Sequence, residues 1–412
     1  MSFLAERFRE EVAKSKDYAT KVEKEFAVGY PTGFLTFDFL NGTIVHVQDP
    51  NPEKCYSYYS IGISDGSMVM AIGRSGSGKT TLVVQMAANI IRPFKTSSIF
   101  YDDIEGGISD TRLQALTGFD SNEIHSRILI RNTAVTAESF YERIKLVHDI
   151  KMENRADYLY DTGVHDIRGE RIYKLEPTVY ILDSLAMLTP DKYANEDELS
   201  GQMSATAAAK QNAMIFKRII PMLKSANIIL FVINHVNQKV DANPMQPTKN
   251  QVSYLKKGET LPGGNTPIYV SNVLLRVDNI SKLKETEGLG VAGEVVEISL
   301  VKSRNNSAGR SVRLIFDRTT GFDSILSLYY FMKERGKIKG AGAYLYVTDY
   351  SDYKFSQKNL KNMLYNNADF RQIFLQECQL ALQEFLQEST CKSYSDNGIT
   401  DDLLKMISGS TM

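Results

Sequence analysis

The chain has 412 residues, 43% of them hydrophobic and 24% charged, and its formal net charge is −1. This length suffices for two or three domains with a substantial core, and the composition is typical of a globular protein. The balanced charge excludes a chain that is basic throughout, so any surface for nucleic acid must be local.

The three cysteines are widely spaced and form no C-x-x-C pair, and the five histidines lack the spacing of metal ligands. Neither a disulfide framework nor a zinc site is indicated, which fits a reducing compartment. The charged N-terminus has no apolar stretch like that of a signal peptide, and no window approaches the length of a membrane span. We therefore expect a cytoplasmic protein with no membrane partner.

Residues 1–30 are predicted to form a short helical segment. Many Lys, Glu and Arg surround apolar residues at near-helical spacing, which indicates one amphipathic helix: Phe3, Leu4, Phe8 and Val12. The segment is too short to be a domain, and the glycines at 29 and 33 end it. Its apolar side is expected to pack on the rest of the chain or on a neighbouring subunit.

Residues 31–322 alternate between strand-like and helix-like patterns. This alternation predicts an α/β core with a mostly parallel sheet and helices on both faces. Continuous apolar runs are typical of strands buried on both faces, and six strands are expected at 68–72, 98–101, 128–130, 179–182, 228–233 and 273–277. Apolar residues alternate on both sides of the turn at 305–309, which predicts an antiparallel hairpin that extends the sheet.

The segment after the first of these strands matches the phosphate-binding pattern G-x-x-x-x-G-K-[ST]. Its residues are Gly73, Arg74, Ser75, Gly76, Ser77, Gly78, Lys79 and Thr80, followed by Thr81 at the start of a helix. Glycines let the backbone aim N–H groups at phosphates, and a helix N-terminus adds partial positive charge. Lys79 is expected to reach the β- and γ-phosphates of a nucleoside triphosphate, and the Thr80 hydroxyl to ligate Mg²⁺. The complete strand, loop and helix disfavour the alternative, a turn that binds nothing.

Acidic residues follow two of the predicted strands. Asp183 follows 179–182, where a Walker B carboxylate would hold the Mg²⁺ shell, although an ordinary capping Asp is the alternative. Because the next residue is Ser184 and not Glu, a base that activates water must come from another strand. Glu105 follows 98–101 and is the better candidate, because two glycines after it leave room for water and nucleotide. A solvated acidic turn is the alternative there.

The segment from Asn234 to Gly264 has no periodicity of its own. A stretch of this length without regular structure inside a domain is usually functional or disordered. Its excess of lysine suits a DNA backbone, whereas a solvated loop is the plain alternative. The candidate DNA-binding residues are Lys239, Lys249, Lys256, Lys257, Gly263 and Gly264. After residue 323, helical patterns at 325–335 and up to about 387 predict a small α/β region.

Together these motifs resemble the RecA-type strand-exchange recombinases, particularly those of bacteriophages, over nearly the whole chain. The similar segments are Pro31-Thr32-Gly33 with Phe37-Asp38-Phe39-Leu40, the strand end from Phe100 to Glu105, the strand end from Val232 to His235, Pro262-Gly263-Gly264-Asn265, Lys302-Ser303-Arg304, and the stretch from Lys339 to Tyr344. The resemblance implies a P-loop RecA-like ATPase core at 31–322, an N-terminal helix for subunit packing at 1–30, and a C-terminal domain at 323–412.

The resemblance also implies roles for single residues. Glu105 would be the catalytic base, and His235 would sense the γ-phosphate. Lys302 and Arg304 would reach the ATP of a neighbouring subunit. Arg112 stands where the family has a Tyr that stacks on adenine, and a guanidinium plane can also stack on a base.

Besides Arg112, two further features depart from the family pattern. One residue is inserted beside Asp103, so the choice of Glu105 as the base depends on counting back from Gly107, and Asp103 is the alternative. The segment 155–176 is longer than the pattern leads us to expect, and the sequence offers no function for it.

The implied function is that of an ATP-dependent DNA recombinase, a DNA-dependent ATPase that uses Mg²⁺. It would form helical filaments on single-stranded DNA and catalyse homologous pairing and strand exchange with double-stranded DNA, in recombination and repair. A heterologous interface that does not close generates such a filament. The expected location is the cytoplasm of a bacterial host cell, with mediator and single-strand-binding proteins as partners. The alternatives are a RecA-fold hexameric DNA helicase, which normally has a larger N-terminal domain, and a regulatory ATPase or loader.

Overall fold

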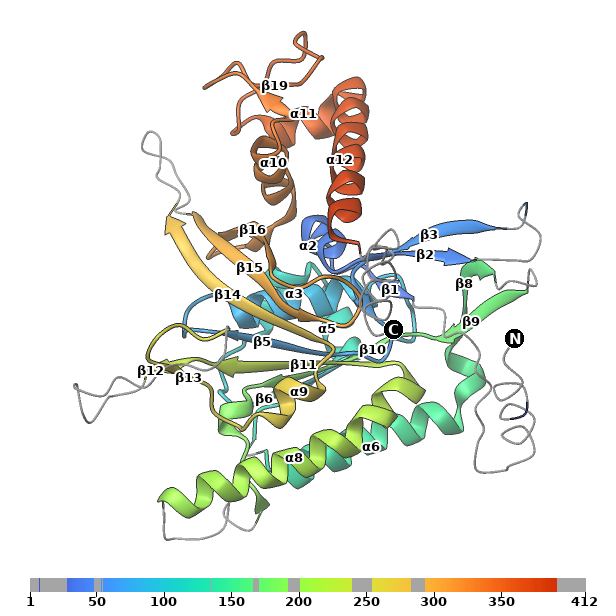
Figure 1. The fold of residues 1–412 in the computed structure, drawn as a ribbon, viewed down its shortest axis with the longest axis vertical. Coiled ribbons are helices and arrows are strands. Elements are labelled where there is room, and N and C mark those ends of the chain that lie inside the picture. Colours follow the sequence, from blue (N-terminus) through green and yellow to red (C-terminus); the bar gives the residue numbers. More distant parts are fainter. Residues whose placement is uncertain are drawn as a thin grey trace, which may run out of the picture.

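The computed structural model (Figure 1) describes residues 28–47, 55–133, 135–165, 170–191, 201–238, 254–282 and 293–390, with Arg7 and Glu53. For 201–208 it describes the backbone alone. The predicted N-terminal helix therefore lies outside the described residues, apart from Arg7. Among the helices within these ranges, none has the length and apolar character that crossing a membrane requires.

A nine-stranded sheet forms the centre of the molecule, in the order β17-β16-β15-β14-β5-β11-β10-β6-β7. The strands from β14 to β7 are parallel, and those from β14 to β17 are antiparallel. In chain order they are β5 (Met68–Gly73), β6 (Ile99–Asp103), β7 (Ile128–Arg131), β10 (Thr178–Asp183), β11 (Ile228–His235), β14 (Val273–Lys282), β15 (Gly293–Ser303), β16 (Arg310–Asp317) and β17 (Gly321–Asp323). All six predicted parallel strands are confirmed, and so is the antiparallel hairpin, β15–β16.

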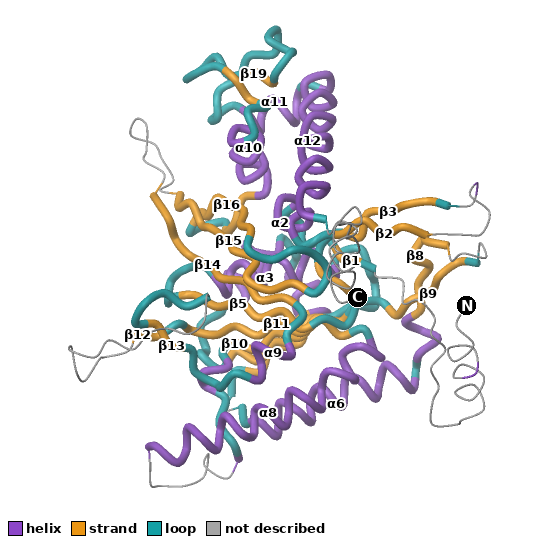
Figure 2. The backbone as a smooth tube through the Cα atoms, viewed as in Figure 1, coloured by secondary structure: helices purple, strands orange, loops and turns teal. Residues whose placement is uncertain are grey.

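Helices cover both faces of this sheet, as predicted (Figure 2). One face carries α3 (Lys79–Ile91), α4 (Asp110–Thr117) and α5 (Ser121–Arg127), and the other carries α6 (Ala137–Glu153) and α8 (Gly201–Ala226). Along β5, Met68, Met70 and Ile72 pack with α6 and α8, whereas Val69 and Ala71 pack with α3. Successive side chains of a strand point to opposite faces, so a strand covered on both sides must be apolar throughout.

The chain after the sheet forms three helices and a two-stranded sheet, which stand above the large sheet in Figure 1. These elements are α10 (Ser324–Glu334), β18 (Ile338–Lys339), β19 (Tyr346–Val347), α11 (Leu360–Asn366) and α12 (Ala368–Ser389). The side chains of Asp323 and Asn367 accept hydrogen bonds from the first turns of α10 and α12, which fixes where these helices begin. Their buried residues join the same hydrophobic cluster as the short helix α2 (Leu35–Leu40).

Two β-hairpins lie on the side of the molecule opposite the carboxyl end of β5 (Figure 1). They are β2 (Thr43–Val47) with β3 (Tyr56–Ser60), and β8 (Leu159–His165) with β9 (Arg171–Leu175). The Tyr56 hydroxyl donates to the carbonyl of His165, which joins the two hairpins. The described part of the segment 155–176, for which the sequence offered no function, thus consists of a short 3₁₀ helix (Arg155–Tyr158) and the second hairpin.

Candidate nucleotide site and adjoining loop

The loop between β5 and α3 has a backbone that glycine alone adopts readily. Gly76 and Gly78 have φ angles of +74° and +89°. A Cβ atom on Gly73 would lie 2.3 Å from the carbonyl oxygen of Val277 in β14, so packing against the next strand also requires a glycine there. The first N–H groups of α3 have no partner inside the helix, and they face the position where the loop could hold an anion.

Lys79 is the first residue of α3 and is buried against this loop, with 4% of its surface exposed. Its Nζ donates to the carbonyl of Arg74 at 2.8 Å. Burial lowers the pKa of Lys79 to about 8, and the charges of Asp183 and Glu105 oppose this shift. Among the described residues the hydrogen-bond partner of this buried ammonium is a neutral carbonyl, so Lys79 lacks a bonded anion, and a phosphate group would supply it.

Asp183 ends β10 beside Thr80, which lies in the first turn of α3. The Thr80 hydroxyl donates to Oδ2 of Asp183 at 2.7 Å, and the Tyr101 hydroxyl donates to the same oxygen at 3.2 Å. The other oxygen, Oδ1, is buried and has no hydrogen-bond partner among the described residues. Burial raises the pKa of Asp183. Hydroxyl and carboxylate oxygens suit Mg²⁺, so this pair fits the ion that the sequence predicts here.

Glu105 and His235 meet from two further strands of the sheet. Nε2 of His235 lies 2.6 Å from Oε1 of Glu105, a hydrogen bond that requires the proton on Nε2. Burial would raise the pKa of Glu105, but the polar side chains of Ser184 and His235 outweigh it and keep this pKa below its usual value. Glu105, Asp183 and His235 each bring one ligand atom within 4.8 Å of the others. The carboxyl ends of β6, β10 and β11 thus gather three predicted residues at one point.

Asp103, the alternative base, is engaged elsewhere. Its two carboxylate oxygens accept the backbone N–H groups of Gly106 and Ile108, both at 3.1 Å, and the side chain is buried. These bonds shape the turn that carries Glu105. The geometry therefore leaves Glu105, which is partly exposed, as the carboxylate that could contact a water molecule.

Arg112, predicted to contact adenine, lies in the first turn of α4. Its Nη1 donates to the carbonyls of Arg318 and Thr319, at 3.0 and 2.8 Å, in the turn between β16 and β17. The guanidinium is thus held at this turn by neutral acceptors.

Lys302 and Arg304 lie at the opposite edge of the sheet from the phosphate loop. In the register of the sheet, Lys302 of β15 lies opposite Leu274 of β14, which in turn lies opposite Met70 of β5. The backbone N–H of Arg304 donates to the carbonyl of Asn272, the residue before β14 begins. Both side chains donate to the carbonyl of Tyr269, at 2.7 and 3.3 Å. They therefore share one surface, which lies near the amino end of β5 and so away from the phosphate loop that follows this strand.

The described part of the segment 234–264 begins and ends at the same strand. Nδ2 of Asn234, in β11, donates to the carbonyl of Pro262 at 2.8 Å. The short strands β12 (Asn237–Gln238) and β13 (Glu259–Thr260) pair antiparallel and close the segment into a loop. Gly263 and Gly264 have φ angles of +89° and +82°, and a Cβ on Gly263 would lie 2.8 Å from Leu185. We call residues 254–264 the loop base.

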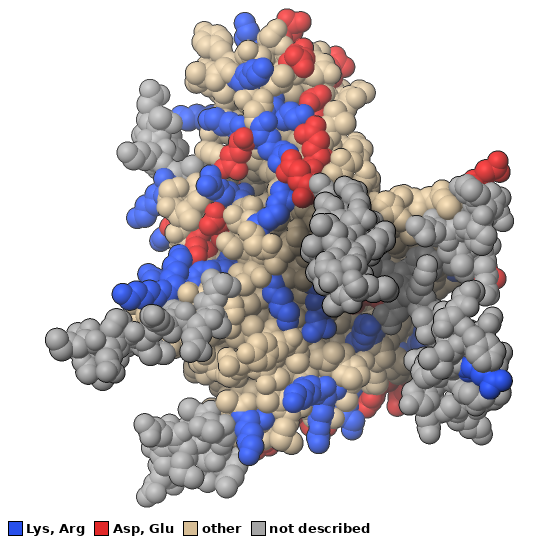
Figure 3. Space-filling view, viewed as in Figure 1, with Lys and Arg blue, Asp and Glu red and all other residues tan. Residues whose placement is uncertain are grey.

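Two of the four predicted DNA-binding lysines lie in the loop base. Lys256 and Lys257 are exposed, and Lys256 forms an ion pair of 3.0 Å with Asp278. Lys239 and Lys249 lie outside the described residues. At the end of the sheet where β14 and the loop base meet, the visible Lys and Arg side chains outnumber Asp and Glu (Figure 3).

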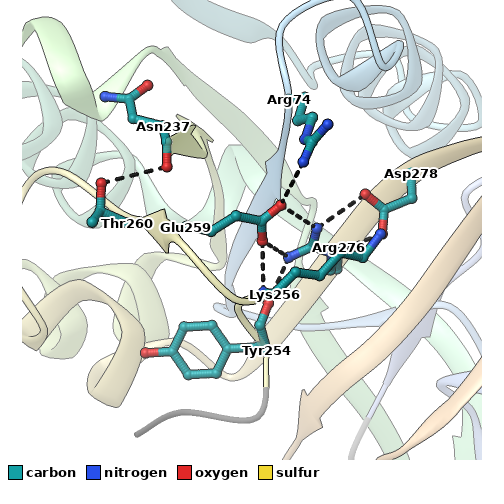
Figure 4. A network of polar contacts seen from close by, with 8 residues as sticks. All are labelled: Arg74, Asn237, Tyr254, Lys256, Glu259, Thr260, Arg276 and Asp278. Carbon is teal, nitrogen blue, oxygen red and sulfur yellow. Dashed lines mark hydrogen bonds and ion pairs between the residues drawn. The ribbon is translucent and has the colours of Figure 1, made fainter. Parts of the chain in front are cut away.

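A buried ion-pair network beside the loop was not predicted (Figure 4). Arg276, in β14, is bound by Glu259 of the loop base and by Asp278, and Arg74 of the phosphate loop reaches the same Glu259. The signal in the sequence was an arginine inside an apolar strand, which must find buried acidic partners.

No family model matches this chain, and no curated protein sequence matches it. The function proposed below is therefore argued from the site and from the motifs.

Proposed function

We propose that this chain is an ATP-dependent DNA recombinase with a RecA-like core. The observation that carries the nucleotide part is the contact of Thr80 with Asp183 beside Lys79, at the carboxyl ends of the parallel strands β5 and β10. Ligands of open α/β sheets bind at this edge of the strands. A buried lysine and a buried carboxylate oxygen, each short of a charged partner, fit a phosphate and a hydrated Mg²⁺.

Each of these residues has a chemical task in this proposal. Lys79 binds the β- and γ-phosphates, and Thr80 and Asp183 hold Mg²⁺, which neutralises charge on the phosphates. Glu105 accepts a proton from the attacking water, for which its low pKa keeps it ionised at neutral pH. His235, bonded to Glu105, lies where a γ-phosphate would change that bond, and so reports the nucleotide state to β11 and the loop that follows it.

The DNA part of the proposal is carried by the loop base. Contacts with the DNA backbone alone are needed, because base pairing between the DNA strands recognises the sequence. The loop base presents exposed lysines, and it closes the segment that begins at the end of β11, the strand that ends in His235. Single-stranded and double-stranded DNA are the partners that this surface would take, with mediator and single-strand-binding proteins acting on the same filament.

Filament assembly would give Lys302 and Arg304 their role. Because they lie away from their own phosphate loop, they could stabilise charge only on the nucleotide of another subunit. Mixtures of Lys302→Ala and Glu105→Gln subunits test this. If hydrolysis recovers in the mixture, the two groups act across an interface. A mixed filament as inactive as either variant would contradict it.

One pair of assays tests the function as a whole. ATP hydrolysis is measured with and without single-stranded DNA, and strand exchange is measured between homologous and heterologous DNA. We expect hydrolysis that DNA stimulates and exchange that requires homology. Unwinding of forked DNA by a six-membered ring would favour a RecA-fold hexameric helicase. Hydrolysis that DNA does not change, without exchange, would favour a regulatory ATPase.

A further inference from the structure

The ion-pair network beside the loop base is centred on Arg276, whose guanidinium is saturated (Figure 4). It makes five hydrogen bonds, to Glu259 at 2.7 and 3.1 Å, to Asp278 at 2.7 and 3.2 Å, and to the carbonyl of Tyr254 at 2.7 Å. Arginine has five N–H donors, so none is left over. Glu259 also accepts the backbone N–H of Lys256 at 2.7 Å. Arg276 and Glu259 thus fix the backbone of the loop base to β14.

The charges of this network do not balance at its centre. One buried arginine faces two carboxylates, which leaves a net charge of −1, and two cations from the surface approach it. Lys256 lies 3.0 Å from Asp278, and Nη2 of Arg74 lies 3.5 Å from Glu259. The Glu259 side chain is fully buried, whereas 58% of the Arg74 side chain is exposed. The contact of Arg74 is thus the longest in the network, and the Arg74 side chain that makes it is more than half exposed.

Arg74 also belongs to the phosphate loop, where it touches Lys79. Its carbonyl accepts the Nζ of Lys79 at 2.8 Å, while its guanidinium reaches Glu259. Arg74 therefore joins the lysine that would bind phosphate to the carboxylate that holds the loop base. A phosphate that binds Lys79 would affect Arg74 at both contacts. It would remove the hydrogen-bond donor from the Arg74 carbonyl, and it would bring negative charge near the Arg74 guanidinium.

We propose that Arg74 is a two-position arm, which holds Glu259 without nucleotide and turns to the phosphates when nucleotide binds, so that nucleotide loosens the loop base. This rests on the nucleotide binding proposed above. Distance and charge favour the movement. The contact of Arg74 with Glu259 is 3.5 Å long and Arg74 is more than half exposed, whereas a phosphate offers an arginine two charged oxygens at once. Release of Arg74 leaves Arg276 in place, so the loop base loosens without unfolding. A freer loop base would then be available to DNA.

Hydrogen–deuterium exchange of the full chain tests this without DNA. Exchange is measured in the phosphate loop (73–80) and in the loop base (254–264), with Mg²⁺ and a non-hydrolysable ATP analogue and without them. In the wild type we expect nucleotide to slow exchange at 73–80 and to speed it at the loop base by about two- to fivefold, the range of an exposed ion pair. The Lys256 amide, which donates to Glu259, is the most direct reporter.

Two variants sharpen the test. In Arg74→Ala the loop base should exchange at the faster rate without nucleotide and should not respond to it, at a nucleotide concentration that saturates the variant as judged by slowed exchange at 73–80, where Lys79 remains. Arg171→Ala is the matched control, since it removes an arginine of similar exposure, 64%, from an ion pair with Asp161 in the distant hairpin β8–β9. It should behave like the wild type.

The outcomes separate this inference from the proposed function. If nucleotide slows exchange at 73–80 but leaves the wild-type loop base unchanged, the arm is wrong while nucleotide binding stands. The arm is equally wrong if Arg74→Ala keeps the wild-type response. If nucleotide changes nothing at 73–80, the proposed site itself fails, and this inference fails with it.

Discussion

Asp102 and Asp183 are buried carboxylates at the ends of the adjacent strands β6 and β10, one register position apart, yet their surroundings differ. Asp102 is bound by the guanidinium groups of Arg131 and Arg143 and by the Tyr180 hydroxyl. Asp183 accepts hydroxyl groups at one oxygen and leaves the other without a partner among the described residues. The two carboxylates have the same chemistry, and the groups around them decide what they do. Both oxygens of Asp102 are bound by protein groups, so Asp102 stabilises the fold, whereas one oxygen of Asp183 could still bind a ligand.

The largest effect is expected at the partly exposed carboxylate beside Asp183. Glu105→Gln should keep ATP binding and lower the hydrolysis rate by about 10²–10⁴, because only the water-activating group is removed. Steady-state hydrolysis and nucleotide titration measure the two quantities. Asp103→Asn is the control, and it should affect the stability of the turn more than the chemistry, since both of its oxygens are bonded within the chain. If Asp103→Asn abolishes hydrolysis and Glu105→Gln does not, the two roles are reversed.

The second prediction exchanges the two compared carboxylates for amides. Asp102→Asn should lower the free energy of unfolding by about 3 kcal/mol, because Arg131 and Arg143 lose their anion while 23% and 19% exposed. Asp183→Asn should leave that free energy unchanged or raise it, since burial makes its charged form costly. Urea unfolding of both variants checks this. A destabilisation by Asp183→Asn as large as that by Asp102→Asn would remove the distinction between them.

A third buried carboxylate sharpens the contrast through pH. Asp38, in α2, accepts the N–H and hydroxyl of Thr32 at one oxygen, and its other oxygen is unpaired among the described residues. Burial raises its pKa from 3.8 to about 7. A raised pKa in the folded state means that Asp38 contributes most to stability below pH 4, and that this contribution is lost as the pH rises to about 7.

The wild type should therefore lose a few kcal/mol, on the order of the shift, between pH 4.5 and 8 relative to Asp38→Asn. Urea unfolding at both pH values measures it. The quantity that tests this is the difference between the two proteins in how their free energy of unfolding changes with pH, not the free energy at either pH. Parallel pH dependence in the two proteins would show that Asp38 is ionised in the folded state at low pH.

The smallest effect concerns the lysines of the loop base. Lys256 is already paired with Asp278, whereas Lys257 forms no ion pair among the described residues. Lys257→Ala should reduce the salt dependence of single-stranded DNA binding by about 0.7 in the log–log slope, and Lys256→Ala by less. Titrations at several salt concentrations give the slopes. Equal slopes for Lys257→Ala and the wild type would contradict DNA binding by this lysine and favour the alternative of a solvated loop.

Much of the sheet and of its carboxyl edge could be predicted from the sequence. Buried parallel strands are continuous apolar runs, so β5, β10 and β11 were found with ends within two residues. Because parallel strands end at one edge, Lys79, Asp183 and His235 could be expected to converge. The hydrogen-bond partners of the acidic side chains could not be predicted. The choice between Asp103 and Glu105 as the base depends on which of the two carboxylates accepts the backbone N–H groups of the turn.

Contacts between segments distant in the chain were the other gap. Glu259 carries no signal of its own in a lysine-rich loop, and its link to Arg276 and Arg74 spans most of the core. The hairpin at 155–176 is similar, since its strands pair with each other and not with the large sheet. Local patterns indicate such elements weakly, because tertiary packing decides where they lie.

The central claim is that the loop at 73–80 and Asp183 form a nucleotide site, and calorimetric titration with ATP and Mg²⁺ tests it most directly. Wild-type protein should bind one ATP per chain, more weakly when Mg²⁺ is chelated, and Lys79→Ala should show no binding at the same concentrations, because the described loop offers no second buried cation to the β- and γ-phosphates. A wild-type chain that gives no heat with ATP, or a Lys79→Ala variant that binds as tightly as the wild type, would contradict the account.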